Sequence, residues 1–266
     1  MTGHLQNISE RSTIQSKSIC LDDTSRDFLD NFELKSALAI PKQKLDIIAF
    51  DACLMNMFEI IYQIKDITEI IIGSEETEPS AGWPYQPILN YMSSNQDVNN
   101  GELAKKIVTL YKESYPATGH NITQSATRTD SFEKAAKGLD VFAAILTEAL
   151  KTIKPTIIDI LTSMQRFGER DYIDLYDFVL LCQKNITQKS ITDSAACLLT
   201  LLDEKIIINI IGGEDVKNAH GISVYFPLGN PKHDVLDMYR KLDFILKYPN
   251  WLRLITTYHK TPNVQR

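Results

Sequence analysis

Asp51 and Cys53 are separated by one residue and directly follow a short apolar run, residues 45–50. The run is rich in β-branched side chains and is typical of a buried strand. In open α/β sheets, reactive groups gather at the carboxyl ends of strands. We expect a helix to begin just after Cys53, and its dipole would favour a thiolate there. The sequence therefore predicts a nucleophilic Cys53, although a lone cysteine is more commonly a small buried hydrophobe.

A second polar cluster, which begins with Ser74 and Glu75, follows the next predicted strand, residues 67–73. The two strands and the helical pattern over 54–64 form a β-α-β unit, for which a parallel pair with a right-handed crossover is the default. Because the strands are consecutive, their carboxyl ends lie close together. We therefore expect Ser74 and Glu75 beside Cys53, as substrate-binding residues.

A cysteine nucleophile needs a base or orienting partner, which is usually His. His4 lies 49 residues before Cys53, near the spacing of about 50 residues that separates the corresponding pair in caspases. His220 stands just before a predicted strand and is more typical of a capping or packing residue. The remaining histidines are predicted on the surface or in loops: His120, His233 and His259.

The elements that must position these residues alternate between strands and helices, which indicates an α/β protein built in layers. Further strands are predicted over 122–128, 205–211 and 221–227. Helices are predicted over 87–93, 101–115, 130–163 (broken near Pro155), 174–185, 189–202 and within the last 35 residues. We expect a single domain over residues 1–266, with a flexible N-terminal segment over residues 1–19.

The composition of the chain excludes some classes of binding partner. The 266 residues carry 28 Lys and Arg against 34 Asp and Glu, a net charge of -6, which argues against nucleic acid or an anionic membrane as the main partner. There is no CxxC pair among the four cysteines, so a zinc ribbon is not expected. The polar start lacks the apolar core of a signal peptide, and the compartment stays open.

The chain resembles the clostripain family of cysteine peptidases. Two segments carry the resemblance, LDIIAFDACLMNMFEIIYQIKD and EIIIGSEETEPSAGWPYQPIL, and CLDDTS, YIDLYDFVLL and NAHGISVYFP support it over roughly residues 20–230. It implies a caspase-like three-layer sandwich, a mostly parallel sheet flanked by helices. It also implies Cys53 as nucleophile and Asp51 in a pocket for a peptide's Arg or Lys at P1. A carboxylate there would pair with such a cation, although Asp51 could instead, or in addition, cap the next helix. Glu75 would either add negative charge to the same pocket or be a solvated loop residue.

The resemblance maps the general acid/base onto His4, with two departures. Leu5 follows it where the family has Gly, whose N–H helps form the oxyanion hole, and only three residues precede it, so we expect the family's N-terminal strands to be missing. A truncated, inactive pseudo-peptidase or basic-peptide-binding module is thus the alternative to an active peptidase. A thiol hydrolase on an unrelated α/β fold would not explain the SEETEPSAGWPY loop.

The resemblance also raises the question of a cofactor, since some members of the family depend on calcium. The acidic residues that could bind this ion are Asp22, Asp23, Glu75, Glu76 and Glu78. No EF-hand-like loop is present, so no calcium site is assigned and no cofactor is expected.

Overall fold

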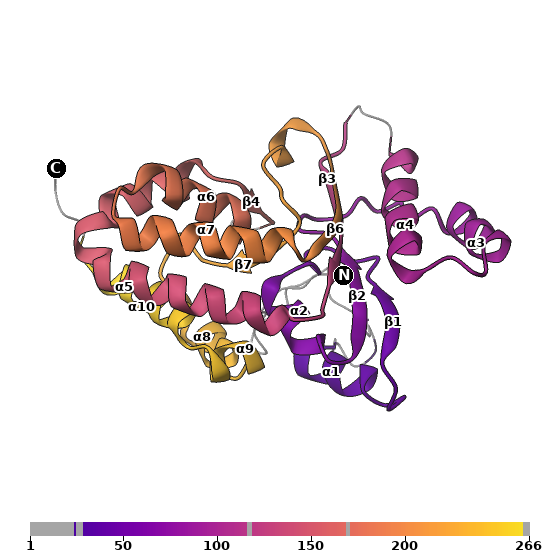
Figure 1. Ribbon diagram of the computed structural model, residues 1–266, viewed down its shortest axis with the longest axis horizontal. Helices are drawn as coiled ribbons and strands as arrows, with labels where there is room; N and C mark the ends of the chain where they lie inside the picture. Colours follow the sequence, from indigo (N-terminus) through magenta and orange to yellow (C-terminus); the bar gives the residue numbers. More distant parts are fainter. Residues whose placement is uncertain (1–23, 25–28, 116–118, 169–170, 263–266) are drawn as a thin grey trace.

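The computed structural model describes residue 24 and residues 29–115, 119–168 and 171–262 (Figure 1). Its four-stranded sheet has the order β1-β2-β3-β6. β1 (Leu45–Ala49) and β2 (Thr68–Gly73) pair in parallel and are joined by α2 (Phe58–Ile64). This confirms the predicted β-α-β unit.

The sheet is mixed in the described residues, whereas a mostly parallel one was expected. β3 (Ile122–Arg128) runs antiparallel to β2, and β6 (Ile206–Gly212) runs antiparallel to β3. The connection from β2 to β3 explains this difference. Its second helix begins beside Glu69, at the start of β2, and ends beside Ile211 near the other edge of the sheet. The chain therefore re-enters the sheet at the carboxyl end of β2 and runs back.

A second, three-stranded antiparallel sheet has the order β4-β5-β7. The predicted strand over 221–227 belongs to this sheet, not to the first one. The predicted helix over 130–163 is continuous through Pro155. The strands of this sheet and the remaining helices are β4 (Arg166–Phe167), β5 (Tyr172–Asp174), β7 (Ser223–Tyr225), α1 (Asn31–Leu38), α3 (Tyr85–Ser94), α4 (Asn100–Ser114), α5 (Phe132–Ser163), α6 (Leu175–Asn185), α7 (Lys189–Asp203), the 3-10 helix η2 (Glu214–Val216), α8 (His233–Tyr239), α9 (Asp243–Lys247) and α10 (Asn250–Lys260).

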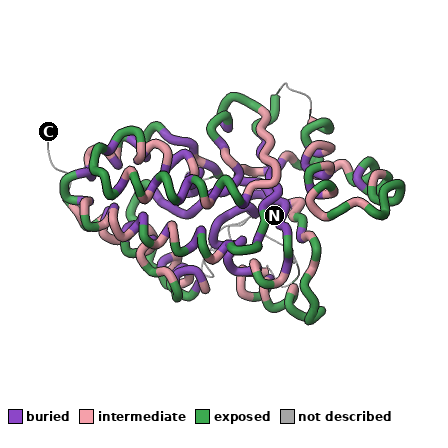
Figure 2. Tube along the Cα trace, in the orientation of Figure 1, coloured by how far each residue is buried: buried purple, intermediate pink, exposed green. Residues whose placement is uncertain are grey.

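Helices cover both faces of the main sheet, which confirms the layered α/β class (Figure 1). On one face, α4 packs Ile107 and Tyr111 against Ile70, Ile72 and Ala126. On the other face, α2 and α5 join a larger core that continues under the second sheet. Figure 2 shows this buried core between helices whose outer faces are exposed. No helix of the described residues is long and apolar enough to cross a membrane.

Candidate active site

The loop over residues 51–57 carries the predicted nucleophile, and it is longer than expected. α2 begins only at Phe58, with Met57 as its N-cap. The prediction that Cys53 sits at the helix N-terminus is therefore wrong, and so is the alternative that Asp51 caps this helix. The physical reason lies at Leu54, whose φ of 58° places it in the left-handed region, where a right-handed helix cannot continue.

Asn56 holds this loop in place. Its Nδ2 donates to Ser125 Oγ at 2.6 Å and to Thr127 Oγ1 at 3.0 Å, and also to the Gly221 carbonyl. Its backbone N–H donates to the Ser74 carbonyl at 3.0 Å. The loop passes so close to β2 that a Cβ on Gly73 would lie 3.1 Å from the Asn56 nitrogen. Only glycine fits there without a shift, so β2 and the loop are built as one unit.

Cys53 lies inside this loop and is 2% exposed. Its Sγ accepts a hydrogen bond from the Glu78 backbone N–H at 3.1 Å, which ties the thiol to the segment after β2. Of the other cysteines, Cys182 is buried in α6, where burial raises the pKa of its thiol, and Cys197 is exposed. Cys20 lies outside the described residues.

Asp51 faces the same segment, residues 78–85. Its Oδ2 accepts hydrogen bonds from the Tyr85 hydroxyl at 2.8 Å and from the Trp83 backbone N–H at 3.4 Å. Gly82 makes this approach possible, because its φ is 67° and a Cβ there would lie 3.0 Å from Asp51 Oδ2. The carboxylate is half-buried, beside the loop that also contacts the thiol.

Glu78 is the residue of this site that sequence reasoning missed. Its carboxyl is buried, and Trp83 Nε1 donates to its two oxygens at 3.3 and 3.2 Å. Burial, and then a hydrogen bond with the Asp51 carboxyl, raise the pKa of Glu78 to about 9 against the opposing effect of Trp83. Nothing in the sequence separates Glu78 from Glu75 and Glu76, because the path of the loop decides which carboxyl meets Asp51.

Ser74 and Glu75 lie next to the cysteine loop, as expected, but their side chains are buried among protein partners. Ser74 Oγ contacts the Glu76 carbonyl and Thr123 Oγ1, both at 2.8 Å. Glu75 Oε2 accepts the Gly221 N–H at 2.7 Å. Burial and the neighbouring Asp174 raise the pKa of Glu75 well above its usual value. These contacts hold the loop in place, and a direct contact of either side chain with substrate stays a prediction.

His4, the predicted base, lies outside the described residues. His220 is half-buried, with Nδ1 3.2 Å from Asp174 Oδ1 and its ring stacked on Tyr176 at 4.7 Å between centroids. Burial lowers the pKa of His220, but the hydrogen bond and charge of Asp174 outweigh it and leave this pKa raised. These contacts agree with a packing role for His220.

Acidic residues do not converge on a metal site in the described part of the chain. No group of three or more His, Cys, Asp or Glu side chains there is arranged to hold a metal ion. Glu75 faces Gly221 and Asp174, whereas Glu78 faces Trp83 and Asp51. Asp22 and Asp23 lie outside the described residues. The described carboxylates do not fit a shared calcium ion, so no step is derived through one.

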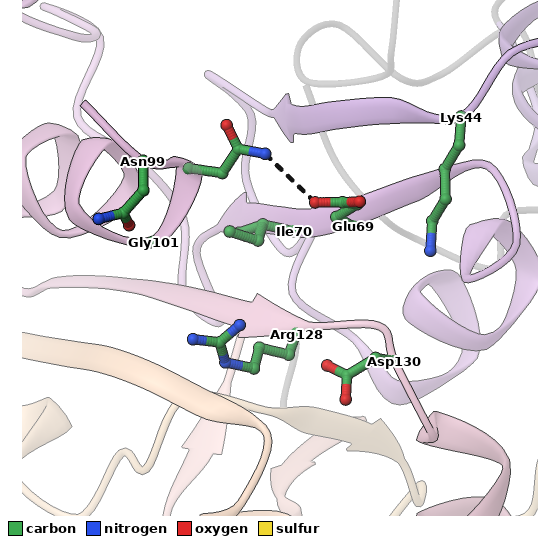
Figure 3. Close-up of a pocket in the computed structure, with 8 residues that line it drawn as sticks. Lys44, Glu69, Ile70, Asn99, Gly101, Arg128 and Asp130 are labelled. Atoms are coloured by element: carbon green, nitrogen blue, oxygen red, sulfur yellow. Dashed lines mark hydrogen bonds between the residues drawn. The ribbon is translucent and has the colours of Figure 1, made fainter. Parts of the chain in front are cut away.

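A cavity of about 410 Å³ lies at the end of the sheet where β1 and β2 begin (Figure 3). It is bounded by the residue before β1, the start of β2, the end of β3 and the start of α4. Its charged residues are of both signs: Lys44, Glu69, Arg128 and Asp130. Because Cys53 follows the opposite end of β1, this cavity is separate from the candidate active site.

Comparison with known proteins gives a match over most of the chain. The model of the Clostripain family matches residues 1–255. A curated relative, clostripain from Hathewaya histolytica, is 23% identical over 287 residues, which cover 88% of this chain and 53% of the relative. The chain thus spans about half the length of the curated relative that it matches.

Solved structures share the fold. A clostripain from Bacteroides thetaiotaomicron in complex with the peptide inhibitor BTN-VLTK-AOMK matches with a TM-score of 0.60 and 20% identity over 88% of this chain and 98% of that chain. An inactive zymogen C11 protease from Parabacteroides distasonis matches with a TM-score of 0.63 and 18% identity, over 88% of this chain and 67% of that chain. A cysteine protease from B. fragilis matches with a TM-score of 0.57 and 19% identity, over 85% of this chain and 94% of that chain.

Proposed function

The chain belongs to the clostripain family, and from that premise we propose that it is a cysteine endopeptidase that cleaves peptides and proteins after Arg or Lys. Cys53 is the nucleophile, His4 is the general acid/base, and Asp51 recognises the P1 side chain. One observation carries the proposal. The segment over residues 78–85 contacts both groups, through the Glu78 N–H on Cys53 Sγ and the Trp83 N–H and Tyr85 hydroxyl on Asp51.

This geometry supports selection of a basic P1 residue. A substrate carbonyl at Cys53 places the P1 side chain next to the carboxylate two residues away. Among the described residues, no Lys, Arg or His side chain pairs with Asp51, so its charge is left for a ligand cation. An Arg guanidinium can bind a carboxylate through two parallel hydrogen bonds, which makes it the better-matched cation.

The reaction follows from these roles. His4 takes the thiol proton as the Cys53 sulfur attacks the scissile carbonyl carbon, and the carbonyl oxygen becomes an oxyanion held in part by the Cys53 N–H. The carbon–nitrogen bond then breaks, and His4 gives the proton to the leaving amine. Water, deprotonated by His4, attacks the thioester and releases the carboxylate product with the thiol restored.

Kinetics on four matched peptide substrates that differ only at P1 (Arg, Lys, Gln and Leu) test the specificity. We expect kcat/KM for Arg and Lys to exceed that for Leu, and Asp51→Asn to lower the Arg and Lys values by about 100-fold or more, since a desolvated charge pair is worth several kcal/mol. Asp46→Asn, an exposed aspartate on β1, is the matched control and leaves the values unchanged. Equal rates on Arg and Leu would remove Asp51 from the proposed role.

His4→Ala tests the catalytic role of His4. We expect it to reduce turnover of the Arg substrate by about 10²–10⁴-fold, the usual contribution of a positioned acid or base. His120→Ala, a loop histidine with an exposed side chain, is the matched control. Unchanged turnover in His4→Ala would contradict its assignment.

A second candidate function is a basic-peptide-binding module without turnover. The observation that favours it is that Asp51, the residue proposed to bind the basic side chain, is held by the Trp83 N–H and the Tyr85 hydroxyl, which both belong to the described residues. The test is to measure binding and hydrolysis of a peptidyl-Arg ligand. Binding without hydrolysis, with a Kd that rises in Asp51→Asn, would support this second function over the peptidase.

A further inference from the structure

Helix α3 differs in composition from the other helices that the structure describes. It contains no Lys, Arg, Asp or Glu, whereas each of the other described helices carries at least one such residue. The helix lies beside α4 at the outer end of the molecule (Figure 1), and Ile88 anchors it in the core on that side of the sheet. A surface helix ordinarily turns charged residues toward water. The uncharged outer face of α3 therefore needs another explanation.

An apolar stripe runs along the exposed face of this helix. Tyr85, Leu89 and Met92 are 56%, 59% and 42% exposed, and their spacing of four and three residues places them on one face. Single exposed apolar residues are ordinary on a protein surface, whereas contiguous ones mark binding sites. The other large apolar side chains that are exposed in the described residues lie singly on separate segments: Ile40, Val141, Leu228 and Leu246.

The stripe begins at the proposed P1 pocket. The Tyr85 hydroxyl donates to Asp51 Oδ2 at 2.8 Å, so one side chain belongs both to the stripe and to the surroundings of the carboxylate. The chain before the helix is fixed there as well, because the Trp83 N–H donates to Asp51 Oδ2 at 3.4 Å. The Gly82 carbonyl accepts the Tyr115 hydroxyl of α4 at 2.6 Å. A basic side chain bound to Asp51 therefore lies next to the first residue of the stripe.

The dimensions and the chemistry of the stripe suit the residues beside P1. From Tyr85 to Met92 the helix rises by about 10 Å, a distance that about three residues of an extended peptide span. An apolar occupant fits best, because α3 offers no charged side chain and a charged group buried there would lose its hydration without gaining a partner. A peptide that places its Arg or Lys at Asp51 brings such a neighbouring segment with it.

We propose that the apolar stripe of α3 is a second specificity-determining surface, which binds an apolar side chain of the substrate within about three residues of the basic P1 residue. This inference rests on the proposed function. Burial of roughly half a Leu side chain corresponds to a gain in affinity of about fivefold. The stripe contacts no reacting atom, so it stabilises the bound substrate and the transition state equally. The gain therefore lowers KM and leaves kcat unchanged.

Peptide substrates with a single Arg in a background of Ser and Gly test the inference. One Leu is moved through the three positions on either side of Arg, and the peptide without Leu is the reference. In wild type, we expect Leu at one or two positions on the same side of Arg to lower KM by about fivefold. Leu89→Ser and Met92→Ser should bring this ratio of KM values close to one, whereas Leu89→Ile, which keeps an apolar side chain, should retain it.

The matched control is Leu246→Ser, which removes a Leu that is 70% exposed on α9 and should keep the ratio. All of these substitutions are at exposed positions, so far-UV circular dichroism should match wild type, and a lost ratio then reports on the stripe. A ratio near one in wild type at every Leu position would overturn the inference, and so would a ratio that persists in Leu89→Ser and Met92→Ser. A wild-type dimer that dissociates in Leu89→Ser, measured by light scattering, would assign the stripe to a second copy and also overturn it.

The same peptides separate this inference from the proposed function. Preferential cleavage after Arg with no effect of the added Leu overturns the role of the stripe alone. Equal cleavage after Arg and after Leu overturns the proposed function. If the peptides are bound but not cleaved, Kd values from fluorescence anisotropy replace KM, and their ratio in wild type and Leu89→Ser decides the role of the stripe. Peptides that are neither bound nor cleaved overturn both.

Discussion

At the scale of single residues, buried carboxyl groups are the distinctive feature of the protein. Glu75 and Glu78 follow the same strand, yet each meets a different aspartate, Asp174 in one case and Asp51 in the other. Both acids have a raised pKa, so the folded protein holds these protons to a higher pH than the unfolded chain does. Protonation near the candidate site is thus coupled to folding.

Glu75→Gln tests this coupling. The folded pKa of Glu75 lies above its usual value of 4.5, so its contribution to stability is full below pH 4.5 and is lost as pH rises through the folded pKa. Gln mimics the protonated acid and has no such loss. We therefore expect the free energy of unfolding of the variant, relative to wild type, to rise with pH above 4.5 by up to about 1.4 kcal/mol per pH unit. Urea unfolding from pH 4.5 to 8 measures it.

The control is Glu148→Gln on the exposed face of α5, which should show a constant difference from wild type across this range. A constant difference for Glu75→Gln as well would mean that Glu75 is ionised in the folded protein.

At the scale of elements, the loop over residues 51–57 decides where the candidate site lies. The apolar periodicity over 54–64 predicts a helix directly after Cys53, but this pattern reports only which residues are buried. Residues 52–57 are buried as well, in a loop whose polar groups form hydrogen bonds with the segment just after β2 and with β3. The sequence therefore predicts the strand that precedes Asp51 and Cys53 correctly, whereas it misses the loop because the partners of the loop are distant in the chain.

Asn56→Ala should weaken this loop. It removes the Nδ2 group that serves Ser125, Thr127 and Gly221 and leaves buried acceptors without that donor. We expect the free energy of unfolding to fall by about 1–3 kcal/mol, with faster alkylation of Cys53 as the loop loosens. Asn185→Ala, on the exposed end of α6, should stay within about 0.5 kcal/mol of wild type. Equal stability of the two variants would show that Asn56 does not hold the loop.

At the scale of the whole molecule, the two sheets are joined through α2. Its Glu59 is 1% exposed, and Oε1 accepts the Tyr225 N–H of β7 at 2.9 Å and the Tyr239 hydroxyl of α8 at 2.7 Å. The alternation of strands and helices predicts the layered class, and the resemblance adds the caspase-like fold. The mixed pairing and the second sheet are not predicted, because strand direction depends on where α4 returns the chain to the sheet.

Glu59→Ala should therefore destabilise the whole protein. It leaves two buried donors unpaired and opens a cavity, for which we expect a loss of about 2–4 kcal/mol in the free energy of unfolding. Glu59→Gln keeps an acceptor and should lose less. Glu102→Ala, exposed in the first turn of α4, is the control. Equal losses in the Gln and Ala variants would contradict a role for the accepting oxygen.

Active-site labelling tests the central claim, that Cys53 and Asp51 form one site for a basic P1 residue. The measurement is the rate of alkylation by a peptidyl-Arg chloromethyl ketone, with the modified residue mapped by mass spectrometry and the peptidyl-Leu reagent as control. We expect labelling at Cys53 that is faster with the Arg reagent than with the Leu reagent, and we expect this difference to be lost in Asp51→Asn. Labelling at Cys182 or Cys197, or equal rates with both reagents on folded wild-type protein, would contradict it.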